Sequence, residues 1–292
     1  MLLAAALLAF AQAASYSTVR PEPVEALPFT HQGQVSPSTS SGRTAEGRLI
    51  PLPEDAVAYL PASAPARPPL LVLLHGAGHR QREMLEHFEA EADARGIVLL
   101  APASRGISWD AVLAVEEPPS LVSPLANARA RRFTGSEDAN RVEAAIAALG
   151  QKVPVDRART VLAGFSDGAT FALAMGMARG HAFAAVIAWS PGIAIRTADP
   201  AHGRRVFVSH GRRDPLLRFD ETCGEIVPML QSEGAAVTFL PFDGGHDAPE
   251  QVKDAFLDAL FGRVAGSPAL PLPAKAETCM PPTHDERLPG VL

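Results

Sequence analysis

Three residues of this 292-residue chain have the types and the order that nucleophilic catalysis requires: Ser166, Asp214 and His246. A serine hydroxyl is a poor nucleophile near neutral pH. It needs a histidine base within hydrogen-bond reach and a carboxylate that orients the histidine. Ser166 lies in the middle of residues 164–168, Gly-Phe-Ser-Asp-Gly, which match the Gly-x-Ser-x-Gly pattern. Acyl transfer through Ser166 is therefore the first chemistry to consider.

The sequence around Ser166 predicts the sharp strand-to-helix turn that this pattern needs. An apolar run, residues 160–163, precedes it, and a segment with helical periodicity begins at Ala169. Gly164 and Gly168 leave room for the helix to pack against the strand. A turn that merely happens to hold a serine is the simpler alternative, and the strand–turn–helix context argues against it.

Asp214 and His246 each follow a predicted strand downstream of Ser166, in the chain order serine, acid, histidine. Asp214 comes after residues 206–209, and His246 comes after residues 237–240 in a glycine-containing loop. The competing acids and histidines lie inside a helix, next to His246 or at positions where a structural or exposed role is expected. They are Asp220, Asp243, Asp247, His181, His202 and His210.

Two backbone N–H groups are candidates for the oxyanion hole that would stabilise negative charge on the reacting carbonyl. The N–H of Asp167, directly after the nucleophile, is the first, and the N–H of Ala77 is the second. Ala77 lies in residues 75–78, His-Gly-Ala-Gly, which follow the apolar run 70–74. We expect the His75 side chain to order this loop.

Apolar runs of strand length alternate with longer segments of helical periodicity, which is typical of a mostly parallel sheet with helices on both faces. The six predicted central strands are residues 70–74, 97–100, 160–163, 185–189, 206–209 and 237–240. The predicted helices are near residues 81–94, 138–149, 168–179, 219–233 and 249–262. Residues 48–60 are expected to add a hairpin of edge strands, which gives a sheet of about seven to eight strands. Asp138 and Asp156 are interpreted as helix or turn caps.

The two ends of the chain differ from this pattern, so we expect one folded domain over residues 48–265. Residues 1–13 form an apolar run ending in Ala-Gln-Ala and are a candidate signal peptide. Export to the periplasm or medium is expected if this segment is a signal peptide, and a cytoplasmic location otherwise. Residues 14–47 are predicted to be a disordered linker and residues 266–292 an irregular tail.

Composition excludes several classes of protein. A net charge of −6 gives no electrostatic footprint for nucleic acid, and no apolar stretch of about 20 residues follows the N-terminus, so integral membrane association is not expected. The two cysteines, Cys223 and Cys279, lack the spacing of a zinc site and form one disulfide at most.

Taken together, the motifs around residues 73–78, 163–169, 209–215 and 242–246 resemble those of the bacterial phospholipase/carboxylesterase-like predicted esterases. The similarity spans about residues 65–262 and implies an α/β-hydrolase fold without a large cap domain. It also implies hydrolysis of a small-molecule carboxylic ester by a serine carboxylesterase-type mechanism, without a metal or an organic cofactor. By the same resemblance, Trp109 would lie near the substrate pocket, unless it only covers the core. Residues 111–135 depart from the family pattern, since Pro118-Pro119 and an arginine-rich run replace a helix.

Other functions stay open at this point. Within the enzyme class, the alternatives are a lysophospholipase and a dienelactone-type hydrolase, although a serine nucleophile argues against the latter. A non-catalytic binding protein with the same fold is the alternative from another class. The acyl and alcohol specificity and the oligomeric state do not follow from the sequence.

Overall fold

A computed structural model of the chain describes residues 47–78, 80–116, 132–264 and 272. The candidate signal peptide lies outside the described residues. The same is true of the predicted linker except Gly47, and of the predicted C-terminal tail except Leu272.

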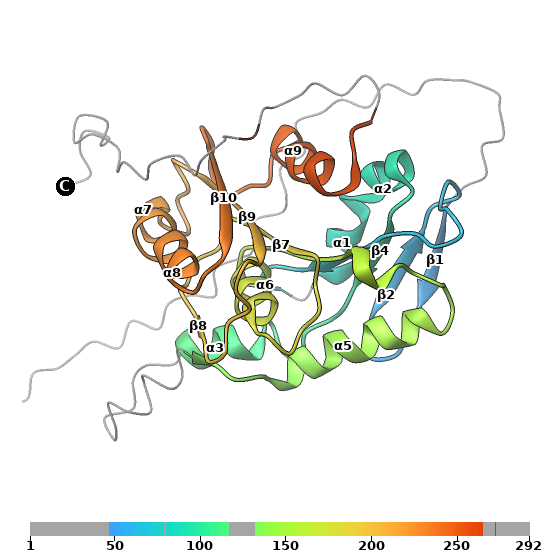
Figure 1. Cartoon of the computed structure of the whole chain (residues 1–292), viewed down its shortest axis with the longest axis horizontal. Helices are drawn as coiled ribbons and strands as arrows, with labels where there is room; N and C mark the ends of the chain where they lie inside the picture. Colours follow the sequence, from blue (N-terminus) through green and yellow to red (C-terminus); the bar gives the residue numbers. More distant parts are fainter. Residues whose placement is uncertain (1–46, 79, 117–131, 265–271, 273–292) are drawn as a thin grey trace, which may run out of the picture.

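The core of the fold is an eight-stranded sheet with strand order β1-β2-β4-β3-β6-β7-β9-β10 (Figure 1). Its strands are β1 (Arg48–Pro51), β2 (Val57–Leu60), β3 (Leu70–Leu74), β4 (Val98–Ala101), β6 (Thr160–Phe165), β7 (Ala185–Trp189), β9 (Arg205–Gly211) and β10 (Ala236–Phe242). The six strands from β4 to β10 in this order are parallel, and the β1–β2 hairpin joins β4 in antiparallel pairing. A separate two-stranded sheet pairs β5 (Arg132–Phe133) with β8 (Arg196–Thr197).

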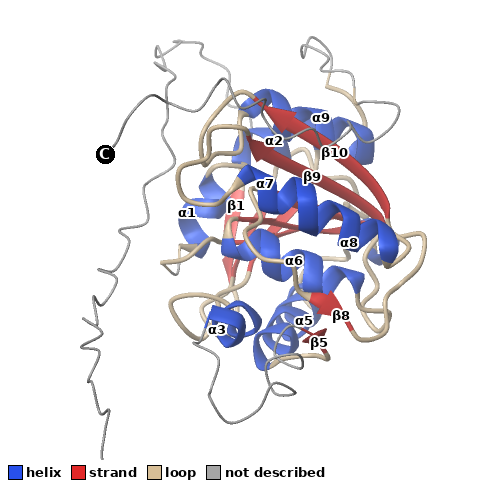
Figure 2. Cartoon of the chain, turned by 90° about the vertical axis from the view of Figure 1, so that its left-hand side faces the viewer, coloured by secondary structure: helices blue, strands red, loops and turns tan. Residues whose placement is uncertain are grey.

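Helices cover both faces of the main sheet (Figures 1 and 2). The helices are α1 (Gln81–Glu86), α2 (Glu89–Arg95), α3 (Asp110–Glu116), α5 (Glu137–Gly150), α6 (Asp167–Met177), α7 (Phe219–Glu221), α8 (Val227–Ser232) and α9 (Glu250–Phe261). A 3-10 turn, η1 (Arg157–Arg159), precedes β6, and a π-helical turn, η2 (Thr222–Ile226), joins α7 to α8. The α1, α2 and α9 helices contribute to the core on one face, and α3, α5, α6 and α8 contribute to the core on the other.

The residues of β3 explain why the sheet is buried on both faces. Side chains of a strand point alternately to its two sides. Leu70, Val72 and Leu74 belong to the core on the α6 side, whereas Leu71 and Leu73 belong to the core on the α9 side. All five are buried, which is why a continuous apolar run, and not an alternating one, encodes this strand.

The predicted fold class is confirmed, and most predicted elements occur within a few residues of their expected bounds. The predicted strands 70–74 and 185–189 match β3 and β7, and the expected edge hairpin is present as β1 and β2. The predicted helix 81–94 is divided, because the chain leaves helical geometry between α1 and α2. The α3 helix was not predicted; it begins at Asp110 and continues into residues 111–135, the stretch that departs from the family pattern.

One predicted cap is confirmed and one is wrong. The Asp156 carboxylate accepts a hydrogen bond from the Ala158 N–H and caps η1. The cap of α5 is Ser136, whose hydroxyl accepts from the Ala139 N–H. Asp138 is two residues after Ser136 and is fully buried, and its carboxylate accepts hydrogen bonds from the backbone N–H groups of Arg105 and Asp110.

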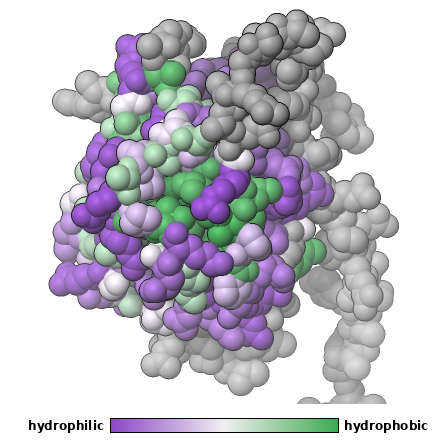
Figure 3. All heavy atoms as spheres, turned by 90° about the vertical axis from the view of Figure 1, so that its right-hand side faces the viewer, coloured by the Kyte–Doolittle hydropathy of each residue, from purple (hydrophilic) through white to green (hydrophobic). Residues whose placement is uncertain are grey.

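The side of the molecule that carries the β1–β2 hairpin presents an apolar patch bordered by hydrophilic residues (Figure 3). A shallow hollow beside this hairpin is lined mostly by alanine and proline between residues 60 and 68. Pro51, the last residue of β1, has no N–H to offer a further strand, so it limits pairing at this sheet edge. No helix in the described part of the chain is long and apolar enough to cross a bilayer.

The β6 strand and the α6 helix are in backbone contact through two glycines. A Cβ atom on Gly164 would lie 2.1 Å from the carbonyl oxygen of Gly168, and a Cβ on Gly168 would lie 2.2 Å from the carbonyl oxygen of Leu74. These neighbours are backbone atoms, so they cannot move aside as the end of a flexible side chain can. Only glycine allows α6 to begin this close to β6 and β3.

We therefore expect Gly164→Ala to lower the free energy of unfolding by about 2–3 kcal/mol, the upper end of the usual cost of overpacking. Urea denaturation followed by circular dichroism would measure the change. Gly150→Ala is the matched control, since a Cβ on Gly150 at the end of α5 meets no atom within 4 Å. Equal stability of the two variants would contradict the packing argument.

Candidate active site

Ser166 occupies the turn between β6 and α6 with a backbone conformation that side chains rarely adopt. Its φ is 56° and its ψ is −120°. The Ser166 N–H donates to the Trp189 carbonyl at 2.9 Å, and the Ser166 carbonyl accepts from the N–H groups of Ala169 and Thr170. Such a conformation costs about 1–3 kcal/mol and persists only where the surroundings hold it. The turn projects the serine away from the sheet at the start of α6.

His246 and Asp214 form a close pair. His246 Nδ1 lies 2.6 Å from Asp214 Oδ2, and the Asp214 side chain is fully buried. Because a carboxylate is only an acceptor, Nδ1 carries the proton, which leaves Nε2 of the same ring able to take a proton. This is the geometry that a histidine base and its orienting acid require.

The pKa of Asp214 is well below its usual range. Burial alone would raise it, but hydrogen bonds from His210, His246 and the Leu217 N–H outweigh that effect. The second carboxylate oxygen, Oδ1, accepts from the N–H groups of Leu216 and Leu217, each at 2.9 Å. Asp214 is therefore a charged acid held by donors on both oxygens.

His246 also lies beside the turn that carries Ser166. Its ring centroid is 4.8 Å from that of Phe165, the residue directly before Ser166. No hydrogen bond joins the Ser166 hydroxyl to His246 among the described residues, and catalytic hydrogen bonds of this type often tighten only when substrate is bound. The structure thus brings Asp214 and His246 together and places His246 next to the serine turn.

The two candidate oxyanion donors lie on elements that meet at Ser166. A Cβ on Gly76 would lie 3.2 Å from Ser166 Cβ, so the loop that carries Ala77 runs directly against the serine. Asp167 is the first residue of α6, where the N–H groups have no intrahelical acceptor. In the described part of the chain, no hydrogen bond occupies the N–H of Ala77 or of Asp167.

Trp109 supports the loop after β3 from inside the core. It is fully buried, and its indole N–H donates to the His75 carbonyl at 2.8 Å. The indole stacks on Phe171 of α6 with 4.9 Å between centroids, and it also contacts the His75 ring. This burial favours the core role over the substrate-binding role considered for Trp109.

A buried carboxylate of α5 holds the segment that carries Trp109. Asp138 accepts hydrogen bonds from the N–H groups of Arg105 and Asp110, both at 2.9 Å. Burial raises the pKa of Asp138, and these two bonds lower it in part. From the same segment, the Ser108 hydroxyl donates to the Asp167 carboxylate at 2.5 Å. Asp138 therefore anchors a loop that contacts both candidate oxyanion segments.

Sequence reasoning did not predict the contact of His210 with Asp214. His210 was expected to be structural or exposed, and it is fully buried, with its Nε2 3.1 Å from Asp214 Oδ2. Its position four residues before Asp214, at the end of β9, was the only signal that could have indicated this contact.

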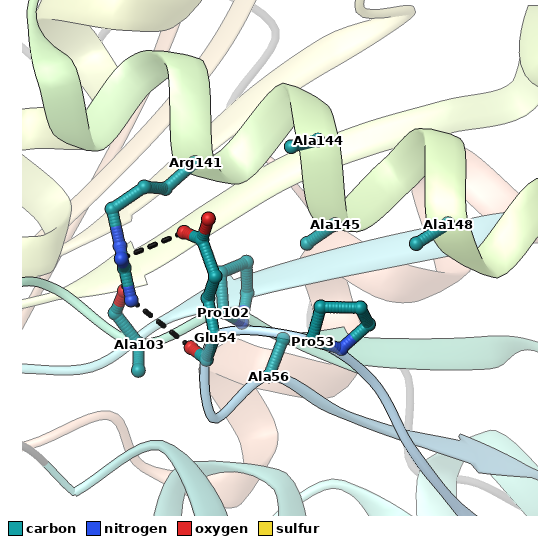
Figure 4. Close-up of a pocket in the computed structure, with 9 residues that line it drawn as sticks. All are labelled: Pro53, Glu54, Ala56, Pro102, Ala103, Arg141, Ala144, Ala145 and Ala148. Atoms are coloured by element: carbon teal, nitrogen blue, oxygen red, sulfur yellow. Dashed lines mark hydrogen bonds and ion pairs between the residues drawn. The ribbon is translucent and has the colours of Figure 1, made fainter.

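A small cavity elsewhere in the molecule is unconnected with these residues. It has a volume of about 120 Å³ and lies between the β1–β2 turn, the segment after β4 and one face of α5 (Figure 4). Arg141 spans it by pairing with the carboxylate and the carbonyl of Glu54, at 2.7 and 3.0 Å. Among the described residues, no group of three or more His, Cys, Asp or Glu side chains is placed to hold a metal ion.

Solved structures with a similar fold include several esterases. Acetyl xylan esterase from Aspergillus awamori has a TM-score of 0.55 at 15% identity, and the alignment covers 74% of this chain and 99% of the esterase chain. Esterase PE8 has a TM-score of 0.50 at 20% identity, with coverages of 74% and 98%. The Bacillus cereus carboxylesterase has a TM-score of 0.50 at 18% identity, with coverages of 74% and 96%. Identities this low show a shared fold.

Sequence comparison gives the family. No curated protein matches the chain significantly. The family model described as Phospholipase/Carboxylesterase matches residues 60–252, which is well over half of the chain and includes all three candidate catalytic residues. The chain belongs to the phospholipase/carboxylesterase family of hydrolases with the α/β-hydrolase fold.

Proposed function

We propose that this protein is a serine hydrolase that cleaves carboxylic esters through an acyl-enzyme intermediate. In this proposal Ser166 is the nucleophile, His246 the general base and Asp214 the acid that orients the histidine. The observation that carries the proposal is the buried 2.6 Å contact between His246 and Asp214, beside a serine held at a positive φ. A purely structural turn has no need for this combination of strain and a buried charged pair.

In the proposed reaction, the same residues act first in acylation of Ser166 and then in hydrolysis of the acyl-enzyme. Ser166 Oγ attacks the ester carbonyl carbon while its proton passes to His246 Nε2, and the oxyanion is stabilised by the N–H groups of Ala77 and Asp167. The alcohol leaves with the proton from His246, which forms the acyl-enzyme. A water oxygen then attacks the acyl carbon while His246 takes one of its protons, and His246 returns that proton to Ser166 Oγ as the bond between Oγ and the acyl carbon breaks and the carboxylic acid leaves. Charged Asp214 stabilises the imidazolium form of His246 in both halves.

Two exposed apolar side chains support an ester with an apolar acyl or alcohol group as the substrate. Ile107 has 65% of its surface exposed. Its backbone carbonyl accepts a hydrogen bond from the N–H of Gly78, which lies in the same loop as Ala77. Leu216, 41% exposed, lies two residues after Asp214 in the same loop and donates its N–H to the Asp214 carboxylate. These segments follow β4 and β9, two strands away from β6 on either side, so they flank Ser166.

We also propose that the protein is exported. Cys223 is disulfide-bonded, and Cys279, outside the described residues, is the only other cysteine of the sequence. Disulfides form and persist mainly in oxidising compartments. This supports a signal-peptide role for residues 1–13, whose Ala-Gln-Ala ending is a cleavage signal.

The first prediction tests the nucleophile and the base. Ser166→Ala and His246→Ala are expected to lower kcat for short p-nitrophenyl esters by about 10⁴-fold, because each removes a member of the triad. A fluorophosphonate probe should label the wild type and leave Ser166→Ala unlabelled. Ser232→Ala is a control, since this hydroxyl only bonds the Met229 carbonyl in α8. Wild-type rates in Ser166→Ala would contradict the assignment of Ser166 as nucleophile. A wild type that neither hydrolyses these esters nor reacts with the probe would favour a non-catalytic binding protein.

The second prediction tests the substrate class. Ile107→Ser and Leu216→Ser are expected to lower kcat/KM for p-nitrophenyl hexanoate by about 5- to 20-fold and for the acetate by less than about 2-fold, since apolar contact is worth about 0.8 kcal/mol per buried CH₂ group. Leu49→Ser is the control, because Leu49 is a similarly exposed leucine on the distant edge strand β1. Equal losses on both esters would contradict an acyl contact, because the two substrates share the same leaving group. Faster turnover of lysophosphatidylcholine than of any short ester would favour the lysophospholipase alternative.

The third prediction concerns export. When the full chain is expressed in a bacterial host, the mature protein is expected to begin at Ala14, with residues 1–13 removed. Mass spectrometry of the intact protein from the periplasm or medium would measure this. Full-length protein found only in the cytoplasm, with reduced cysteines, would contradict the proposal.

A further inference from the structure

Asp214 is shared by two histidines. Its Oδ2 atom lies 2.6 Å from His246 Nδ1 and 3.1 Å from His210 Nε2. The side chains of Asp214 and His210 are both fully buried, so no water competes for this contact. The ester mechanism uses His246 alone, which leaves a second, buried and titratable ring on the acid without a role.

The contacts of His210 fix where its proton is. Besides Asp214, the Nε2 atom lies 3.0 Å from the Leu217 carbonyl. Both partners are acceptors only, so Nε2 carries a proton and donates it. On the other side of the ring, Nδ1 lies 2.8 Å from the hydroxyl of Thr222, which also lies 3.0 Å from the Pro191 carbonyl. Thr222 therefore holds the ring in the orientation that points its Nε2–H at Asp214.

Thr222 is placed by an irregular piece of helix. It is the first residue of the π-helical turn η2, and it is fully buried. Single π-helical turns inside α-helices are uncommon and occur frequently at functional sites. The hydrogen-bonded chain thus runs from η2 through His210 and Asp214 to His246.

We propose that His210 is a positioning residue that tunes the basicity of His246 through their shared Asp214 oxygen. This inference rests on the proposed serine-esterase function. By donating to Oδ2, His210 fixes the carboxylate and withdraws part of the negative charge that would otherwise act on the His246 imidazolium. Without this donor, the charge on Oδ2 acts on His246 alone, and His246 becomes a stronger base.

Other charged groups lie on the elements that carry this chain of contacts. They are Arg212, Arg213, Arg218, Asp220 and Glu221 on the acid loop and α7, Asp243 and Asp247 around His246, and Asp167 at the start of α6. Arg213 pairs with Asp243, and Arg218 lies near Asp220, with these side chains largely exposed. Water and salt screen such pairs strongly. All of these groups are the same in every variant below, so a change in titration reports on the buried chain.

The experiment compares His210→Leu, which removes both ring nitrogens, with His210→Gln, whose side-chain amide keeps an N–H donor. For His210→Leu we expect kcat to fall by about 10-fold, KM to change by less than 2-fold because the buried ring touches no substrate, and the acidic midpoint of the kcat/KM profile to move upward by about 0.5–1 pH unit. His210→Gln should restore at least half of both changes. p-Nitrophenyl butyrate hydrolysis between pH 4 and 9 would measure all three quantities.

Thr222→Val is a second route to the same answer, since it removes only the hydroxyl that orients the ring. The acidic midpoint of Thr222→Val should move in the same direction by a smaller amount. If circular dichroism shows that His210→Leu does not fold, the midpoint of Thr222→Val tests the proposal. His181→Leu is the matched control, because His181 pairs with Glu143 at 2.6 Å far along the chain from this cluster. Its midpoint and kcat should equal those of the wild type.

A purely structural role gives a different pattern. An unchanged midpoint in folded His210→Leu or Thr222→Val, or a His210→Gln variant as impaired as His210→Leu, would overturn the proposal. Failure of the ester function itself is distinguishable, because the wild type would then lack hydrolysis or phosphonate labelling of Ser166.

Discussion

The buried charge on Asp214 constrains more of this site than any other single group. An ionised carboxylate without water needs donors for both oxygens, because an unpaired buried charge is costly. Here four donors come from three places: two backbone N–H groups of its own loop, His210 at the end of β9, and His246 after β10. The hydrogen bonds to this one carboxylate therefore hold the loop of Asp214 and the loop of His246 in place relative to each other.

The parallel sheet determines where these loops meet. β3, β6, β9 and β10 run in the same direction, so the loops that carry Ala77, Ser166, Asp214 and His246 all begin at the carboxyl ends of parallel strands. The strand register also places the ends of β6, β7 and β9 at a similar level, since Phe165 pairs with Trp189 and Trp189 pairs with Ser209 across adjacent strands. A glycine contact then brings the histidine loop against β9, because a Cβ on Gly211 would lie 2.1 Å from the Gly245 carbonyl oxygen.

Sequence reasoning predicted the elements whose signal is local and missed those that depend on distant partners. β3 and β7 are continuous apolar runs, so their bounds were readable. The division between α1 and α2 at His87 and Phe88 has neither glycine nor proline to mark it, and the short α3 helix precedes a proline pair. The Gly-x-Ser-x-Gly pattern and the chain order of the three candidate catalytic residues were visible in the sequence. The role of His210 was not, because it depends on Thr222 in a π-helical turn that no periodicity encodes.

The backbone of Ser166 has a consequence for how such a chain responds to selection. Glycine adopts a φ of 56° without the strain that a serine side chain incurs there, so folding stability alone favours glycine at this position. A library screened only for thermal resistance would therefore tend to discard the serine. A serine at this strained position therefore indicates a selective pressure other than stability.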